Sequence, residues 1–277
     1  MQGIKEYASE VKIISRLRHK NLVKLLGWCH EKGELMLVYE FLANGSLDTH
    51  LFKGKSLLTW EVRYKIVQDL ESALLYLHEE GDYCVLHKDI KTNNIMLDTN
   101  FNAKLGDFGL ARLVDHAKGG LKNTLLAGTV GYMAPECLSS GKASKESDVY
   151  SFGVVALEIA CGRRSIEHKF EESEALLVPW VWKSYGNERV LYVADKKQGI
   201  AFDPKQMECL LIVGLWCAHP SHDLRPSIRQ AIQVLHFETP LPNLPGSMPI
   251  PNYNVPIAPG IGSSEPPISN MTLTIPR

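Results

Sequence analysis

The sequence lacks three features that mark specialised classes of protein. Charge of one sign is not in excess, since 30 Lys and Arg oppose 31 Asp and Glu, which argues against a general attraction to nucleic acid or anionic membrane. The six cysteines form no Cys-x-x-Cys pair, so we interpret them as buried thiols rather than disulfides or metal ligands. The apolar run nearest to membrane-spanning length, Val154 to Cys161, is interrupted by Glu158, and Met1 to Lys5 do not begin a signal peptide.

Proline is concentrated at one end of the chain. Ten of the fifteen prolines fall between Pro240 and Pro276, with few charges around them, a composition typical of extended or disordered segments. We therefore predict a disordered tail over residues 239–277. The whole chain, with 277 residues of which 45% are hydrophobic and 22% charged, has the composition of a globular protein and is long enough to bury a large core.

Hydrophobic periodicity predicts a largely helical protein with one hairpin near its start. Apolar residues recur at helical spacing from Tyr7 to Leu17 and along one face from Trp60 to Glu80. Two apolar runs, Leu22 to Cys29 and Glu34 to Phe41, are separated by a short polar link and predict the hairpin. Further helices are predicted over Asp148–Cys161, Glu174–Ser184, Pro204–Cys217 and Pro226–Phe237.

The stretch from Val85 to Leu97 has the pattern of a polar loop held between two buried segments. It contains Asp89, Lys91 and Asn94. These side chains can accept a proton from a hydroxyl, neutralise a phosphate and bind a divalent metal. Two further motifs follow in the chain, Gly-Asp-Phe-Gly at residues 106–109 and Ala-Pro-Glu at residues 134–136.

These three motifs, in this order, resemble the signatures of protein kinases. The resemblance covers nearly all of Gly3 to Phe237. Within the family, the chain most resembles the plant receptor-like kinases, and its residues Ser144 to Gly162 are similar to the lectin-type branch of that group. It implies an α+β, protein-kinase-like fold. Residues 1–42 would be a truncated N-terminal lobe, reduced to helix C and a two-stranded hairpin. Residues 43–238 would be a complete, mostly helical C-terminal lobe, and residues 239–277 the tail.

The resemblance also implies an activity, namely transfer of the ATP γ-phosphate to serine or threonine hydroxyls of a protein. It assigns Asp89 as the catalytic base and Lys91 as the stabiliser of the transferring phosphoryl group. Asn94 and Asp107 would hold Mg²⁺ and complete the catalytic set. A lysine two residues after the aspartate is the serine/threonine pattern, and Thr129 matches the threonine that bridges Asp89 and Lys91.

The nucleotide contacts follow from the same resemblance. Tyr39, Glu40 and Leu42 match the hinge that meets adenine, with Tyr39 at the back of the pocket. Met96 matches the floor of the pocket, and Asp107 would reach the nucleotide through the metal. Glu10 matches the glutamate of helix C that pairs with a phosphate-contacting lysine.

Three further contacts are expected from the resemblance. Asp148 should accept backbone N–H groups of the catalytic loop. Arg225 should pair with Glu136 of the Ala-Pro-Glu motif. We also predict that Thr124 is the phosphorylation site that orders the loop before that motif, because Thr129 is committed to the active site.

Two parts of a kinase are missing from the sequence. No glycine-rich loop and no Val-Ala-x-Lys precede Glu10, and the only Gly-x-Gly, at residues 260–262, lies among the C-terminal prolines. We therefore expect a feeble kinase at best, and an uncovered apolar edge on the strand Glu34 to Phe41. The alternative is a non-catalytic, kinase-like binding module that engages partners without phosphoryl transfer.

The expected partners are ATP with Mg²⁺, a protein substrate with a serine or threonine acceptor, and an upstream receptor or kinase. We expect no nucleic acid, and the sequence does not set the oligomeric state. The expected location is cytoplasmic, at the cytoplasmic face of the plasma membrane if the chain is part of a longer receptor.

Overall fold

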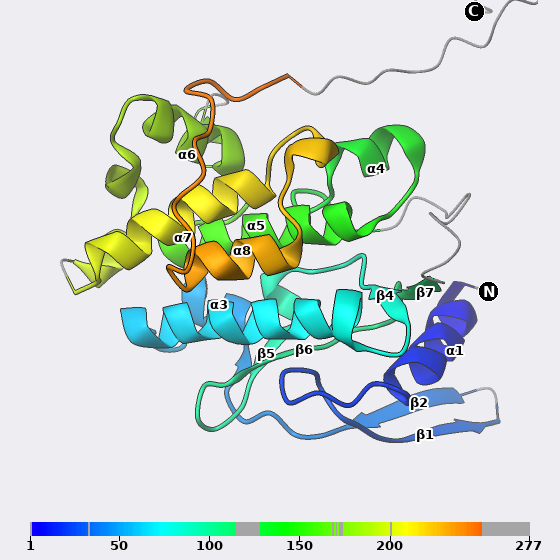
Figure 1. Cartoon of the computed structure of the whole chain (residues 1–277). Coiled ribbons are helices and arrows are strands. Elements are labelled where there is room, and N and C mark those ends of the chain that lie inside the picture. Colours follow the sequence, from blue (N-terminus) through cyan, green and yellow to red (C-terminus); the bar gives the residue numbers. More distant parts are fainter. Residues whose placement is uncertain are drawn as a thin grey trace, which may run out of the picture.

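The computed structural model describes residues 2–32, 34–114, 128–167, 169, 171, 174–199 and 201–250. A small lobe of one helix and one hairpin lies beside a larger helical lobe (Figure 1). The helices are α1 (Gln2–Ile14), α2 (Leu47–Leu51), α3 (Trp60–Leu75), α4 (Pro135–Ser140), α5 (Lys145–Cys161), α6 (Leu177–Gly186), α7 (Pro204–Cys217) and α8 (Ile228–Leu235). The strands are β1 (Leu25–Glu31), β2 (Glu34–Tyr39), β3 (Gly45–Ser46), β4 (Cys84–Leu86), β5 (Ile95–Leu97), β6 (Ala103–Leu105) and β7 (Arg112–Val114). The predicted α+β kinase-like fold is confirmed.

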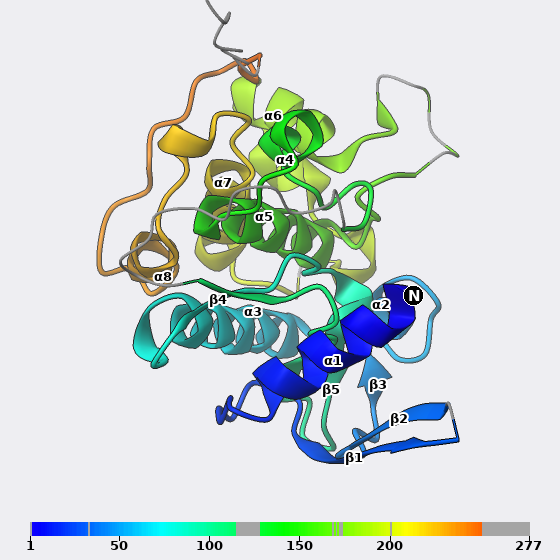
Figure 2. The same cartoon turned by 90° about the vertical axis from the view of Figure 1, so that its right-hand side faces the viewer.

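Helix α5 forms the centre of the larger lobe (Figures 1 and 2). It is apolar nearly all round, and its residues from Ser147 to Cys161 are buried, as expected for a helix surrounded by others. A Cβ added at Gly153 would lie 2.7 Å from the Gly214 carbonyl oxygen, so the two glycines let α5 and α7 approach closely. A reciprocal capping box between the side chains and amides of Ser144 and Ser147 fixes the start of α5.

Two small sheets shape the polar loop of residues 85–97. Strand β5 pairs antiparallel with both β3 and β6, and β4 pairs antiparallel with β7. The loop therefore has a paired strand at each end, as its apolar flanks predicted. In the β5–β6 pair, Ile95 lies opposite Leu105, which brings the residues just outside both strands side by side.

The small lobe leaves apolar side chains uncovered. Strands β1 and β2 form a two-stranded antiparallel sheet with a bulge between Leu25 and Gly27. At least half of the surface of four side chains is exposed there, namely Leu26, Trp28, Met36 and Val38. Within the described ranges no third strand pairs with this hairpin, so the predicted apolar edge is present.

Some predicted boundaries differ from the structure. The helix that begins at Trp60 ends at Leu75 and continues as a π-helical turn over Tyr76–Glu80. The helix predicted from Glu174 begins at Leu177. Within the part of the chain that the structure describes, no helix is long and apolar enough to cross a membrane.

The start of the proline-rich segment is packed against the larger lobe. It has no regular secondary structure up to Ile250, but Leu244 is buried in the core and contacts α6 through hydrogen bonds. Residues 239–250, which were predicted as part of the disordered tail, are therefore packed on the lobe, with Leu244 buried in its core. Residues 251–277 lie outside the described residues.

Candidate active site

A single buried carboxylate holds the backbone of the polar loop. Asp148 lies in the first turn of α5 with 1% of its surface exposed. Its Oδ2 accepts the His87 amide at 2.8 Å and its Oδ1 accepts the Lys88 amide at 2.9 Å, while His78 Nε2 donates to Oδ2 at 3.0 Å. These bonds stabilise the left-handed backbone of Lys88, whose φ of 72° is uncommon for a residue with a Cβ. The prediction that Asp148 accepts amides of this loop is confirmed.

The His87 ring connects the loop to the Gly-Asp-Phe-Gly segment. Burial lowers the pKa of His87, so the ring is neutral and carries one N–H. Its Nε2 lies 3.1 Å from the Gly106 carbonyl oxygen, and its Nδ1 lies 3.3 Å from the Asp89 amide. Nε2 is therefore the donor and Nδ1 the acceptor. The ring also meets the edge of Phe108, with centroids 4.9 Å apart, so the two motifs are packed as one unit.

The Asp89 carboxylate lies among three donors. Thr129 Oγ1 donates to Asp89 Oδ1 at 2.6 Å, and Lys91 Nζ lies 2.6 Å from Oδ2 and 3.0 Å from Thr129 Oγ1. Asn94 Nδ2 donates to the Asp89 carbonyl at 2.9 Å and to Oδ2 at 3.1 Å. The predicted bridge by Thr129 between Asp89 and Lys91 is confirmed. A carboxylate and an ammonium thus lie together at a position that is only partly exposed.

The β5–β6 pair brings Asn94 and Asp107 to the same end of the sheet. Asn94 precedes β5, Gly106 follows β6, and the Gly106 amide donates to the Asn94 carbonyl at 2.9 Å. Because Asn94 Nδ2 faces Asp89, the side-chain oxygen of Asn94 is left for another partner. Asp107 is exposed with a φ of 64°, and among the residues described its carboxylate has no hydrogen-bond partner. Among the described residues, the Asn94 amide oxygen and the Asp107 carboxylate are therefore available to a ligand.

Glu10 of α1 binds two groups that are not lysines. The Tyr39 hydroxyl and, at 3.2 Å, the Phe108 amide both donate to Glu10 Oε1. Burial raises the pKa of Glu10, and burial next to this carboxylate also raises the pKa of Tyr39. Helix α1 is thereby tied to the end of β2 and to the Gly-Asp-Phe-Gly segment. The sequence analysis did not predict this role of Tyr39. The signal was that Glu10 had no lysine to pair with, so that a hydroxyl could serve as its hydrogen-bond donor.

The residues that match the adenine-binding hinge lie at the end of β2. Tyr39 is the last residue of the strand, and the Glu40 amide continues the pairing by donating to the Lys24 carbonyl at 3.0 Å. Within the described part of the chain, neither the Glu40 carbonyl nor the Leu42 amide has a hydrogen-bond partner. One acceptor and one donor are therefore left at this edge. Met96, the predicted floor, lies in the middle of β5 and is partly exposed.

A second buried carboxylate links the polar loop to the segment before Ala-Pro-Glu. Glu158, in the last turn of α5, accepts the Tyr132 hydroxyl at 2.9 and 2.8 Å and the Ser165 amide at 2.6 Å. The same hydroxyl lies 3.3 Å from Thr92 Oγ1 in the polar loop. Burial raises the pKa of Glu158 to about 7. The sequence analysis missed this network, although a lone glutamate inside an apolar helix was a signal for it.

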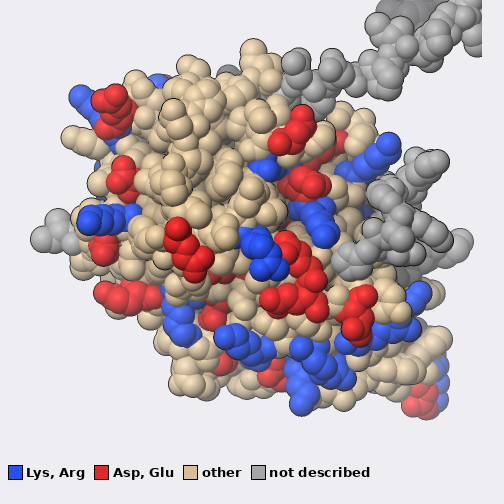
Figure 3. All heavy atoms as spheres, viewed as in Figure 1, with Lys and Arg blue, Asp and Glu red and all other residues tan. Residues whose placement is uncertain are grey.

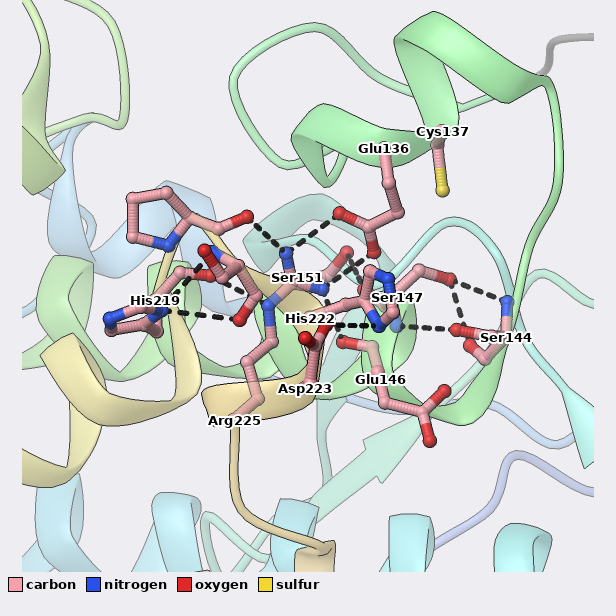
Figure 4. Close-up of polar contacts among 12 residues, drawn as sticks. Glu136, Cys137, Ser144, Glu146, Ser147, Ser151, His219, His222, Asp223 and Arg225 are labelled. Carbon is pink, nitrogen blue, oxygen red and sulfur yellow. Dashed lines mark hydrogen bonds and ion pairs between the residues drawn. The ribbon is translucent and has the colours of Figure 1, made fainter. Parts of the chain in front are cut away.

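The predicted pair between Arg225 and Glu136 is present and buried (Figure 4). Arg225 Nη1 and Nη2 meet the two Glu136 carboxylate oxygens at 2.6 and 2.7 Å. The remaining donors of the guanidinium reach the carbonyls of His219, Pro220 and Glu146. Every N–H of this side chain is therefore used, which is the condition for burying such a charge.

The segment after Gly109 is tied to α1. Ser9 Oγ donates to the Ala111 carbonyl at 3.1 Å, and Arg112 Nη1 donates to Ser9 Oγ at 2.9 Å. Thr124, the predicted phosphorylation site, lies outside the described residues, and the prediction made for it stays a prediction.

Comparison with known proteins gives consistent results. The family described as "Protein kinase domain" matches residues 1–237. The chain is 60% identical over 257 residues to the L-type lectin-domain containing receptor kinase IX.1 of Arabidopsis thaliana. The aligned region covers 92% of the chain and 39% of the relative. It is 54% identical to the receptor kinase IX.2 of the same plant, over 99% of the chain and 42% of the relative. It is 45% identical to the receptor kinase SIT2 of Oryza sativa subsp. japonica, over 88% and 36%. The chain thus spans about two fifths of the length of these relatives, and the resemblance to lectin-type receptor kinases is confirmed.

Proposed function

The chain belongs to the protein kinase family, and on this premise we propose that it transfers the γ-phosphate of ATP to serine and threonine hydroxyls of a protein substrate. The observation that carries the proposal is the cluster of Asp89, Lys91 and Thr129, whose side-chain atoms lie 2.6–3.0 Å from one another. Phosphoryl transfer requires mainly positioning and neutralisation of charge. A carboxylate and an ammonium fixed against each other provide both.

In the proposed mechanism the acceptor hydroxyl approaches the Asp89 carboxylate, which accepts its proton as the oxygen attacks the γ-phosphorus. The bond from this phosphorus to the β–γ bridging oxygen breaks in the same step, and ADP leaves. Lys91 lies beside that carboxylate and stabilises negative charge on the transferring phosphoryl group as a point charge. Thr129 donates to Asp89 and keeps the carboxylate oriented. The Glu40 carbonyl and Leu42 amide would bind the edge of adenine over Met96, with Tyr39 closing the back of the site.

The donor set of Asn94 and Asp107 fits Mg²⁺. Both offer hard oxygen atoms, which this ion prefers, and the Asn94 amide is turned by Asp89 so that its oxygen is the free atom. No group of three or more His, Cys, Asp or Glu that could hold a metal occurs in the described ranges, so phosphate and water would complete the coordination, as is usual for Mg²⁺. When bound, the ion would neutralise charge on the phosphates.

One observation favours a second candidate function, a binding module that does not transfer phosphate. Glu10 is occupied by the Tyr39 hydroxyl and the Phe108 amide, where the family resemblance calls for a phosphate-contacting lysine. A chain of this kind would bind partners through its kinase-like surface. The relatives are receptor kinases by name, so for either candidate we propose an upstream receptor as partner and a location at the cytoplasmic face of a membrane.

Peptide phosphorylation separates the two candidates. The chain would be incubated with ATP and Mg²⁺ and with three peptides that differ only in a serine, threonine or tyrosine acceptor, and the products analysed by mass spectrometry. We expect phosphate on the serine and threonine peptides, none on the tyrosine peptide, and none with Asp89→Asn. Binding of ATP without phosphate on any peptide would refute the first candidate and support the second.

A further inference from the structure

The segment after α8 lies in a groove of the larger lobe. Residues 239–250 run from α8 past α7 to α6 (orange in Figures 1 and 2). Leu244 is inserted, with 8% of its surface exposed, whereas Leu241, three residues earlier, is 41% exposed. The surface over this segment, seen in the same view in Figure 3, is largely uncharged. Leu244 is therefore the one buried apolar side chain of the segment, and Met248 packs against the core while partly exposed.

Two aromatic side chains of α6 bind the backbone of the segment. Trp182 Nε1 donates to the Pro245 carbonyl at 2.9 Å. The Tyr185 hydroxyl accepts the Leu244 amide at 3.2 Å and donates to the Leu244 carbonyl at 3.3 Å. Because these bonds go to the main chain, they require an extended backbone rather than particular side chains. A sequence preference then comes from the side-chain contacts, chiefly that of the buried Leu244 and less that of the partly exposed Met248.

The shape of the groove depends on one glycine. A Cβ added at Gly186 would clash with the Gly246 carbonyl oxygen, whereas a Cβ added at Gly246 would meet nothing within 4 Å. The groove is not filled, since a hollow of about 360 Å³ remains beside Leu244, lined also by Val190 and Ile212 and by the acidic residues Glu188 and Glu208. The segment itself carries prolines at positions 240, 242, 245 and 249, which keep a peptide extended and reduce the entropy lost on binding.

We propose that the groove of α6 and α7 is a binding site for an extended peptide in which a leucine is followed by proline, and that residues 240–246 are its resident ligand. Aromatic side chains that contact a proline-rich backbone, with a pocket for one apolar side chain, are a general mode of peptide recognition. Because this ligand belongs to the same chain, its effective concentration is in the millimolar range and a separate peptide must compete with it. No residue of the candidate active site lines this groove, so a test of peptide binding does not depend on whether the chain transfers phosphate.

The test uses the full chain and a labelled synthetic peptide of residues Thr239–Ile250. Leu244→Ser in the chain should release the resident segment. Hydrogen exchange of the amide at position 244 should then become faster, because this amide no longer donates to the Tyr185 hydroxyl. The free peptide should then bind this variant at least about tenfold more tightly than it binds the unaltered chain. A peptide carrying Leu244→Ser should not bind, and one carrying Leu241→Ser should bind as the parent peptide does.

A second pair of variants tests the groove from its other side. Gly186→Ala should displace the resident segment, and Gly246→Ala, whose added methyl group would meet nothing within 4 Å, should leave it in place. Leu244→Ser without faster exchange at position 244, or peptide binding that does not depend on the leucine, would overturn the proposal. Equal behaviour of Gly186→Ala and Gly246→Ala would also overturn it, even if one of the other variants failed to fold.

Discussion

Replacing Arg225 by alanine should destabilise the protein by about 3–5 kcal/mol, because it leaves a partner of a buried ion pair alone. The Arg225 side chain has no exposed surface and Glu136 is 19% exposed, so water can solvate the carboxylate only in part. The carbonyls of His219, Pro220 and Glu146 would lose a donor at the same time. The expected fall in Tm is roughly 6–20 °C for a domain of this size.

Arg229 provides a matched control. It pairs with Glu79 at 2.7 Å, but 57% of its side chain is exposed, so Arg229→Ala should destabilise by about 1 kcal/mol or less. Arg225→Lys should fall between the two, because lysine keeps the charge and loses the two-pronged contact. Denaturant unfolding followed by circular dichroism measures all three. Similar losses for Arg225→Ala and Arg229→Ala would refute the reasoning that burial sets the strength of this pair.

Three further predictions concern buried carboxylates. Asp148→Asn should destabilise by about 2–4 kcal/mol and slow phosphate transfer, because the charge that accepts two loop amides is lost; Asp82→Asn on the surface should do neither, and equal unfolding midpoints would contradict this. Tyr39→Phe and Glu10→Gln should be non-additive in a double-mutant cycle by about 1 kcal/mol, whereas simple additivity would show that their contact contributes nothing. Burial raises the pKa of Glu71 to about 8, in a site where His236 Nε2 lies 2.6 Å from Glu71 Oε1. The folded state therefore holds this proton more tightly, and wild-type stability should fall as pH rises from about 5 to about 8, by at most about 1.4 kcal/mol per pH unit. Glu71→Gln should remove this dependence, and parallel pH profiles of the two proteins would contradict the assignment.

The parts of the site that were predictable are those set by short spacings in one loop. Asp89, Lys91 and Asn94 lie within six residues, so any loop with paired strands at both ends must place them near each other. The contacts of Asp148 and Thr129 with this loop are long-range, and they were predicted only because the motifs resemble a family in which such partners are known. The structure confirms these contacts through hydrogen bonds at 2.6–3.0 Å.

The parts that were not predictable depend on three-dimensional packing. Glu10 lacked its expected partner, and only the arrangement of α1 against the end of β2 shows that Tyr39 donates to it. The composition of the proline-rich segment is typical of an extended or disordered chain, and composition does not reveal which leucine packs into an apolar groove. Glu158 was visible as a charge within an apolar helix, yet its partner Tyr132 lies 26 residues away in a loop.

The measurement closest to the central claim is phosphate incorporation by the full chain itself. The chain and Asp89→Asn would be incubated side by side with ATP and Mg²⁺, and the intact mass of each recorded over time. We predict added phosphate on the unaltered chain and none on Asp89→Asn. Equal incorporation by both proteins, or none by either, would contradict the assignment of this cluster as a phosphoryl-transfer site.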